Sequence, residues 1–462
     1  MKKLFTLLFS IVFIAGWLSG SIYFYQINKE RIEEKIIALS HVTLIDGYGG
    51  APVENVTLMI RNNIIADIVF ETSRELPSNA EVIDLKGCYV TPGLIDAHDH
   101  LATSPSGYDK RYYIEAYLQH QLYGGITSVR DMAGDVRALA DLARVAKLDE
   151  IESPDIYYSA LMAGPSFFND PRTISSCMGE TPGRIPWMKA ISPDTDIHLA
   201  VAHAKGTGAT GIKIYANLPA NEVKRITEEA HRQGMQVWAH FSVFPARPSE
   251  VIAAGVDTVS HIGMLPWEAI EDIAPRYPGR RDFSSLSADY PAFRKLYEQM
   301  VEEDTILDAT FARGIEMGKK ENPKKKKQLE QKLNLATELM KLAYKTGVQI
   351  DTGTDFGVEI HKDLFPSLHK EIEMLVKLVG MTPLEAIKSA TLTSAKAIGI
   401  ESTHGSIAPG KIANLVVFSA NPARDIKNIN SIMLIIKNGR IHDRRKYVLP
   451  KVYRPGKEPK LK

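Results

Sequence analysis

Hydrophobic and polar positions change their rhythm along the chain, and this divides it into regions. Through the middle of the sequence, short apolar runs alternate with helix-like segments such as NEVKRITEEAHRQG (221–234) every few tens of residues. Eight strands with intervening helices predict a (β/α)8 barrel, an α/β fold resembling a TIM barrel. The candidate strands are GLIDAH (93–98), GITSVRD (125–131), DIYYSAL (155–161), TGIKIY (210–215), MQVWAHF (235–241), VDTVSHI (256–262), TILDATF (305–311) and VQIDTGTD (348–355). A doubly wound sheet is the alternative, but no Gly-x-Gly-x-x-Gly turn follows the first strand.

The two ends of the chain show a different pattern, with short strand-like runs separated by turn residues. Such runs are IIALSHVTLIDGYGG, VTLMIRNNIIADIVF and EVIDLKGCYV near one end, and HGSIAPGKIANLVVFSANP and IMLIIKNGRIHD near the other. We expect residues 37–90 and 399–446 to complete one small β-sandwich, with a hydrolase barrel inserted between them over residues 91–398.

The first 26 residues form a separate unit. Lys2 and Lys3 precede an apolar stretch from Leu4 to Tyr25, which is the pattern of an export signal. The stretch approaches the roughly 20 residues that span a bilayer, and no clean Ala-x-Ala site follows it. Residues 1–26 are therefore expected to be a cleaved signal peptide or an uncleaved membrane anchor, with the catalytic part exported to the periplasm or another space outside the cytoplasm.

Composition adds limits to this picture. The 462 residues are 44% hydrophobic and carry a formal charge of +1, which indicates a large core and no general attraction to nucleic acid. Cys88 and Cys177 are too few for a disulfide framework or a cysteine-rich zinc module, although one bridge between them stays open.

Candidate chemistry begins with LIDAHDHL at the end of the first barrel strand. Alternation places His98 and His100 on the same face, where two imidazoles make half of a divalent metal site. The pair alone also fits two hydrogen-bonded histidines at a loop. Further ligand-type side chains lie in or at the end of other predicted strands, the edge at which barrel enzymes hold their active sites. These side chains are Lys213, His240, His261 and Asp355.

The ordered motifs HDH, IKIY, WAHF, SHIG and GTDFG resemble the amidohydrolase superfamily of metal-dependent hydrolases from about residue 37 to residue 446. The flanking TPGLIDAH and GSIAPGKIANLVVF look most like its imidazolonepropionase-related branch, which includes Xaa-Pro dipeptidases. The resemblance implies two divalent metal ions, with zinc expected first and Mn, Co or Fe also suited. It further implies that His98, His100 and Asp355 bind one ion, that His240 and His261 bind the other, and that Lys213 bridges them as a carbamate formed with carbon dioxide. Imidazolonepropionase is expected to use one metal and to lack this lysine, so Lys213 argues against that activity.

The reaction expected from such a site is amide hydrolysis by a metal-bridging hydroxide. Asp355 would pass the proton of the attacking water to the leaving nitrogen, or would serve only as a ligand. The expected substrate is a small molecule or dipeptide with a peptide or N-acyl amino acid bond, including Xaa-Pro. Cyclic amides, esters and phosphotriesters are the alternative substrates, and an exported metal-binding protein without turnover is the alternative of another class.

Three residues are candidates for substrate binding. Tyr215 shares the face of Lys213 and would bind a substrate carbonyl or carboxylate, or simply pack. Arg130 offers a planar fork to a terminal carboxylate, or pairs with Asp131 or Asp135. His361 would line the mouth of the barrel or sit in solvent. The long connection GPSFFNDPRTISSCMGETPGRIPWM after the third strand is expected to form a lid.

Overall fold

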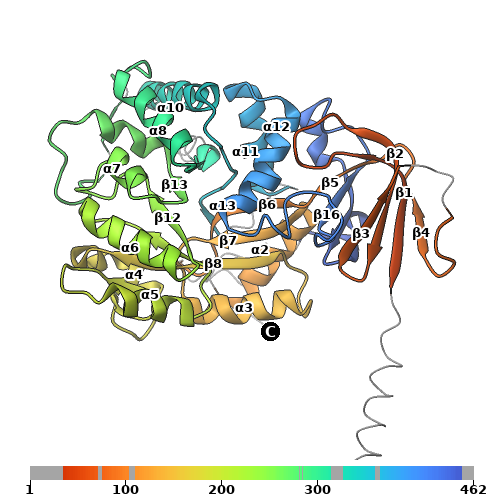
Figure 1. Cartoon of the computed structure of the whole chain (residues 1–462), viewed down its shortest axis with the longest axis horizontal. Coiled ribbons are helices and arrows are strands. Elements are labelled where there is room, and N and C mark those ends of the chain that lie inside the picture. The colour runs from red at the N-terminus through yellow and green to blue at the C-terminus, as the bar shows by residue number, and fades with distance from the viewer. Residues whose placement is uncertain are drawn as a thin grey trace, which may run out of the picture.

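Two sheets organise the protein, which is known here from a computed structural model (Figure 1). The structure describes residues 35–70, 75–103, 110–279, 281–283, 285–313, 326–358 and 365–449. The predicted signal or anchor (1–26) and His361 lie outside these ranges and stay predictions. Within the described residues, no helix has both the length and the apolar character needed to cross a bilayer.

The larger sheet is the predicted barrel. Its main strands pair in parallel in the order β6 (Leu94–His100), β7 (Ile126–Asp131), β8 (Asp155–Ala163), β11 (Gly211–Ile214), β12 (Gln236–His240), β13 (Thr258–Ser260) and β14 (Ile306–Asp308). The segment 349–355, with the short β15 (Phe356–Gly357), links the two edges. Asp351 donates its N–H to Leu307 of β14, while Ala97 of β6 donates to Thr352 and Asp355 donates to His98. These hydrogen bonds close the sheet.

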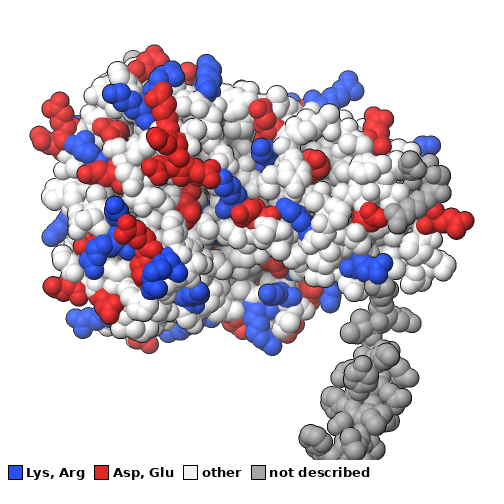
Figure 2. All heavy atoms as spheres, in the orientation of Figure 1, with Lys and Arg blue, Asp and Glu red and all other residues white. Residues whose placement is uncertain are grey.

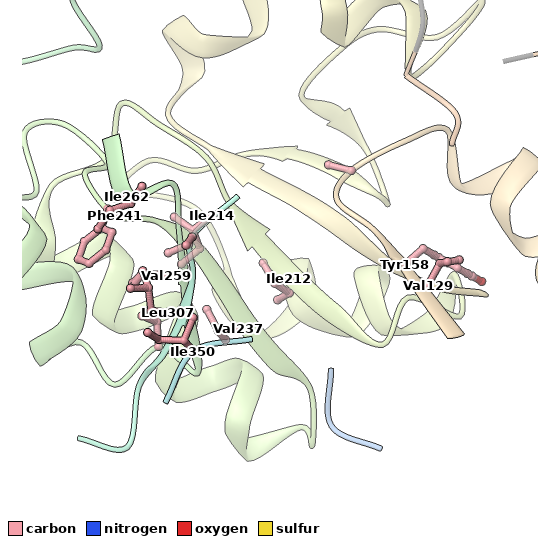
Figure 3. Packing of buried hydrophobic residues seen from close by; sticks show 14 of the residues in the cluster. Val129, Tyr158, Ile212, Ile214, Val237, Phe241, Val259, Ile262, Leu307 and Ile350 are labelled. Atoms are coloured by element: carbon pink, nitrogen blue, oxygen red, sulfur yellow. The ribbon is translucent and has the colours of Figure 1, made fainter. Parts of the chain in front are cut away.

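Helices cover the outside of this sheet and account for its packing. They are α2 (Arg111–Tyr123), α3 (Val136–Lys147), α5 (Ile197–Gly206), α6 (Ala220–Arg232), α7 (Pro248–Ala253), α8 (Pro291–Glu302), α10 (Lys326–Thr346), α11 (Ser367–Met374), α12 (Pro383–Lys388) and α13 (Ser394–Ala397). In β11, Ile212 and Ile214 join the main apolar cluster with Val237 and Leu307 (Figure 3). Alternation sends Lys213 to the opposite face of the strand, into the barrel.

The shorter helical turns complete this layer and the connections. They are η1 (Pro165–Asn169), α4 (Pro171–Ser175), η2 (Ile262–Ala269), η4 (Leu375–Val379), η5 (Ser389–Thr393), η6 (Ile426–Asn430) and η7 (Arg444–Lys446). A short hairpin of β9 (Arg184–Ile185) and β10 (Met188–Ala190) extends the barrel sheet beside β8.

The second sheet combines both terminal segments, which lie together on the right of Figure 1. Its strands are β1 (Ile36–Leu44), β2 (Val53–Arg61), β3 (Ile64–Val69), β4 (Glu81–Asp84), β5 (Tyr89–Pro92), β16 (Leu415–Phe418), β17 (Ile432–Lys437) and β18 (Arg440–Asp443). β1 branches, because its residues 37–40 pair with β4 and residues 43–44 pair with β5. β16 then pairs with β5, which joins the two ends of the chain. The predicted fold class, a TIM-like barrel with a smaller β-domain, is confirmed. The terminal segments, which were predicted to form a β-sandwich, supply the eight strands of one sheet in the described residues.

Two smaller features bear on the sequence analysis. Cys88 and Cys177 are both buried and free, so the bridge left open above is not formed. Acidic and basic side chains are intermixed over the face shown in Figure 2, in keeping with the near-zero net charge.

Candidate metal centre

Three of the predicted ligands meet where the first and last barrel strands adjoin. The Asp355 carboxylate lies 3.0 Å from Nε2 of His100 and 3.5 Å from Nε2 of His98. One ligand atom from each residue lies within 4.8 Å of the others, a spacing that a shared cation would fit. Burial alone would raise the pKa of Asp355, but the hydrogen bond from His100 and the nearby imidazoles outweigh it and hold the pKa well below its usual range. Asp355 is therefore an anion beside two imidazoles, a donor set that suits zinc-like ions.

The other two histidines extend this group. The His261 ring lies 5.1 Å from the His98 ring and 4.8 Å from the His240 ring, measured between centroids. Burial lowers the pKa of His240 well below its usual value and that of His261 to about 3. Both rings are thus neutral at pH 7, and a neutral imidazole keeps the lone pair that metal binding needs. His261 has a φ of 76°, which turns the chain sharply off β13.

Lys213 is fully enclosed inside the barrel. Its Nζ donates to Oγ of Ser260 at 3.0 Å, and that hydroxyl donates to Asp308 at 2.8 Å. Burial lowers the pKa of Lys213 to about 7. A large share of this amine is neutral near pH 7, and the neutral form is the one that adds carbon dioxide. The environment therefore fits the carbamate that the resemblance implies. The charge of a protonated Lys213 also contributes to the lowered pKa of His240 and of His261, after burial.

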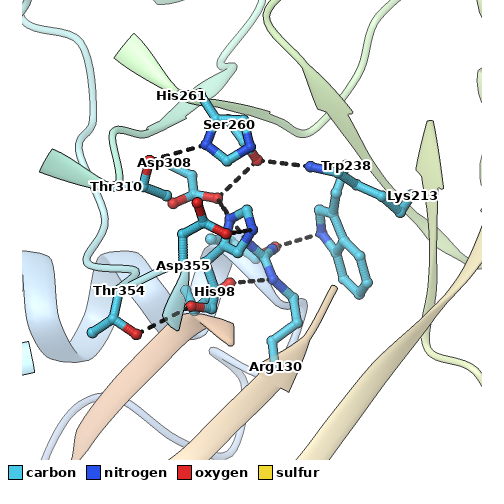
Figure 4. A network of polar contacts seen from close by, with 12 residues as sticks. His98, Arg130, Lys213, Trp238, Ser260, His261, Asp308, Thr310, Thr354 and Asp355 are labelled. Carbon is cyan, nitrogen blue, oxygen red and sulfur yellow. Dashed lines mark hydrogen bonds and ion pairs between the residues drawn. The ribbon is translucent and has the colours of Figure 1, made fainter. Parts of the chain in front are cut away.

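Asp308 is a site residue that sequence reasoning missed. Its Oδ2 lies 2.5 Å from Nδ1 of His98, and both side chains are buried (Figure 4). Burial would raise the pKa of Asp308, but His98 and Arg130 hold it at about 2. An ionised carboxylate only accepts hydrogen bonds, so Nδ1 of His98 carries the proton and Nε2 is left as the ligand atom. The available signal was its place in TILDATF, at the end of β14.

The structure corrects the expectation for Arg130. Its side chain is fully buried beneath the site, where it donates to the backbone carbonyls of Ala97 and Ala397. The guanidinium also lies 4.5 Å from the Trp238 ring centroid and 3.6 Å from Asp308 (Figure 4). Arg130 therefore lies enclosed in the barrel interior, and its described ion pair is with Asp308 rather than with the predicted Asp131 or Asp135.

Tyr215 lies at the edge of the group. Its ring is 4.0 Å from the His240 ring and 4.4 Å from the Phe167 ring, between centroids. Phe167 belongs to the long connection after β8, which is ordered into η1, α4 and the β9–β10 hairpin. Tyr215 therefore lies beside both His240, one of the predicted metal ligands, and Phe167 of this connection.

Comparisons with known proteins agree with this geometry. A family model described as the amidohydrolase family matches residues 89–442. Imidazolonepropionase from Pseudomonas savastanoi pv. phaseolicola is 26% identical over 395 residues, covering 81% of this chain and 90% of that protein. Ochratoxinase from Aspergillus niger is 26% identical over 444 residues, covering 86% of this chain and 83% of that protein.

Solved structures show the same fold. A Xaa-Pro dipeptidase with methionine bound in its active site superposes with a TM-score of 0.66 and 23% identity, covering 89% of this chain and 100% of that one. Molinate hydrolase superposes with a TM-score of 0.71 and 20% identity, covering 93% of this chain and 99% of that one. At these levels of identity, the two matches show a shared fold and nothing further.

Proposed function

Because the chain belongs to the amidohydrolase family, whose members hydrolyse carbon–nitrogen bonds, we propose that it is a binuclear metal-dependent amidase. Its substrate would be a peptide or N-acyl amino acid, with Xaa-Pro dipeptides included. One observation carries this proposal. Four histidines and Asp355 lie close together inside one end of the barrel, and Lys213 is linked to them through Ser260 and Asp308.

His98, His100 and Asp355 would hold one cation, and His240 and His261 the other, with a carboxylated Lys213 between them. Divalent ions in such a site supply Lewis-acid polarisation of a carbonyl group and a lowered pKa for water. His98 is held in one tautomer by Asp308, which leaves the lone pair of Nε2 available to bind an ion. The carbamate would carry the negative charge that a protonated lysine lacks.

Asp355 is the residue placed to move the proton. Its carboxylate is ionised and accepts from His100, so it can take a proton from the attacking water. It would pass that proton to the amide nitrogen, which must be protonated before it leaves. Tyr215, beside His240, would donate its hydroxyl proton to a substrate oxygen and orient the bond that breaks.

The test is amine release by the purified protein across a library of dipeptides, including Xaa-Pro, and N-acyl amino acids. Release that a chelator abolishes and added divalent metal restores is the expected result. Metal binding at two ions per chain with no release from this library would contradict the proposal, and would favour the cyclic amides, esters and phosphotriesters. Bound metal with no hydrolysis of any of these substrates would favour a metal-binding protein without turnover.

A further inference from the structure

The connection after β8 brings a positive charge to the edge of the metal centre. Arg172, in the short turn α4, places its guanidinium carbon 5.5 Å from the centroid of the Tyr215 ring. The Tyr215 ring in turn lies 4.0 Å from the His240 ring. One aromatic ring therefore separates this cation from a proposed metal ligand. Lys213 and Arg130, the cations beneath the site, are enclosed, whereas more than half of the Arg172 side chain is exposed to solvent.

Local contacts fix the connection in this position. Gly164 donates its N–H to Ala216, and a Cβ at Gly164 would lie only 1.8 Å from the carbonyl oxygen of Asn217. Only glycine permits this approach of the two backbones. Asn217 then donates its side-chain amide to Ser166 at 3.1 Å, and Phe167 packs on Tyr215. The start of the connection is thus attached to the end of β11, the strand that carries Lys213.

Arg172 is also oriented by its own neighbour. Asp170 caps α4 by accepting the N–H of Arg172, and the same carboxylate accepts from Nε and Nη2 of the guanidinium. A guanidinium has five donors; the Asp170 contacts use one edge of it, and the guanidinium also interacts with the hydroxyl of Tyr215. The edge formed by Nη1 and Nη2 has the fork geometry that binds a second carboxylate with two parallel hydrogen bonds.

From this arrangement we propose that Arg172 binds the free carboxylate of the substrate and so selects acids over their neutral analogues. The assignment rests on the proposed function, because it takes the scissile carbonyl to lie at the histidine cluster. In an N-acyl amino acid or dipeptide, the carboxylate carbon is two bonds beyond the scissile nitrogen. A substrate lying across Tyr215 therefore reaches Arg172 with its carboxylate while its amide faces His240.

The chain offers a matched control in the preceding connection of the barrel. Arg137 follows Asp135 at the start of α3 with the same spacing, and its Nε and Nη2 bind the Asp135 carboxylate at 3.0 and 2.6 Å. Its guanidinium carbon lies 5.1 Å from the centroid of the Trp187 ring. The local motif is thus the same, but Trp187 has no described ring contact with the histidine cluster. Arg137 also donates to the carbonyl of Met178, which with Trp187 belongs to the connection that carries Arg172. Arg137→Met therefore removes an equivalent cation that holds this connection but has no described contact with Tyr215, and it controls for loosening of the connection.

The test uses probes that the enzyme does not cleave. N-Methylsulfonyl derivatives of glycine, leucine and proline replace the scissile carbonyl, and the matching alcohols replace the carboxylate by CH2OH. Calorimetry on the metal-loaded protein should show at least one acid binding about tenfold or more tightly than its alcohol. Arg172→Met should reduce that ratio to about twofold or less, and Arg137→Met should leave it unchanged.

Three results would overturn the assignment. They are the absence of any acid preference in the unaltered protein, a preference that survives Arg172→Met, and an equal loss in both variants. Amine release is measured separately, so the two proposals fail independently. Acid preference without chelator-sensitive turnover would refute the amidase proposal and keep the subsite, whereas turnover without acid preference would do the reverse.

Discussion

Replacing Asp308 by asparagine tests whether a buried carboxylate sets the ligand state of His98. The substitution keeps the shape of the side chain but removes the charge that faces Nδ1 at 2.5 Å. The carboxylate and the imidazole are both fully buried, so solvent screens this contact little. Removing such a partner from a metal-binding histidine typically weakens metal affinity by about 10- to 100-fold, or roughly 1.4–2.8 kcal/mol. Competition against a chromophoric chelator measures this loss directly.

Asp351→Asn is the matched control for this measurement. Asp351 is also fully buried, and neither of its oxygens has a hydrogen-bond partner among the described residues. Burial raises its pKa well above the usual value, which favours the neutral acid, so an amide is a close substitute. We expect less than a threefold change in metal affinity for this control. Unchanged affinity in Asp308→Asn, or equal weakening in both variants, would refute the role given to Asp308.

Four further outcomes follow from the structure. Lys213→Ala should lose most activity and regain part of it with a short carboxylic acid, whereas full activity without the additive would exclude a carbamate. After carbon dioxide is stripped, reactivation at a fixed concentration of dissolved carbon dioxide should speed up as pH rises through about 7, because burial lowers the pKa of Lys213 to that value and only the neutral amine reacts. A flat rate from pH 6 to 8 at constant dissolved carbon dioxide would contradict this. Gly353→Ala would place a Cβ 2.6 Å from Cβ of His98, so we expect about 1–3 kcal/mol lower stability in urea and weaker metal binding. Gly263→Ala, where a Cβ meets nothing within 4 Å, should show neither effect. Arg130→Met should lower the free energy of unfolding by about 3–5 kcal/mol by leaving a buried carboxylate uncompensated; a loss confined to the KM of acidic substrates would restore its predicted substrate role.

Alternation along strands explains why much of the site could be predicted. His98 and His100 share a face because they are two residues apart on β6, and this rule needs no tertiary information. His240 ends β12, His261 directly follows β13 and Asp355 directly precedes β15. Because parallel strands end at the same edge of a sheet, their positions in the sequence were enough to predict that they lie together.

The alternation of residues along a strand does not show how deep inside the barrel a side chain lies. Arg130 points inward from β7, but it lies one residue before the strand ends and is covered by Trp238. Its partners, the carbonyls of Ala97 and Ala397, come from β6 and α13. These partners come close to Arg130 only when the barrel closes, and the local sequence does not predict that contact.

Arg172 was missed for a different reason. It lies in a connection without strand or helix periodicity, so no repeating pattern marks the face on which it lies. Its position depends on the contact between Gly164 and Asn217, which are far apart in the sequence and meet only when β8 and β11 pair. A residue placed by two neighbouring strand ends is visible only in the folded chain.

The pairing of β5 with β16 also constrains how the chain folds during its synthesis. Val90 pairs with Val417, so this edge of β5 stays unpaired until a strand more than three hundred residues later has left the ribosome. At about 5–20 residues per second, that delay is on the order of tens of seconds. An open strand edge readily pairs with other chains, so nascent copies are exposed to aggregation throughout this interval. β6 begins one residue after β5 and also lacks its hydrogen bonds to the segment 349–355 until that segment is synthesised. His98 and His100 are therefore synthesised early but are among the last site residues to be fixed in place.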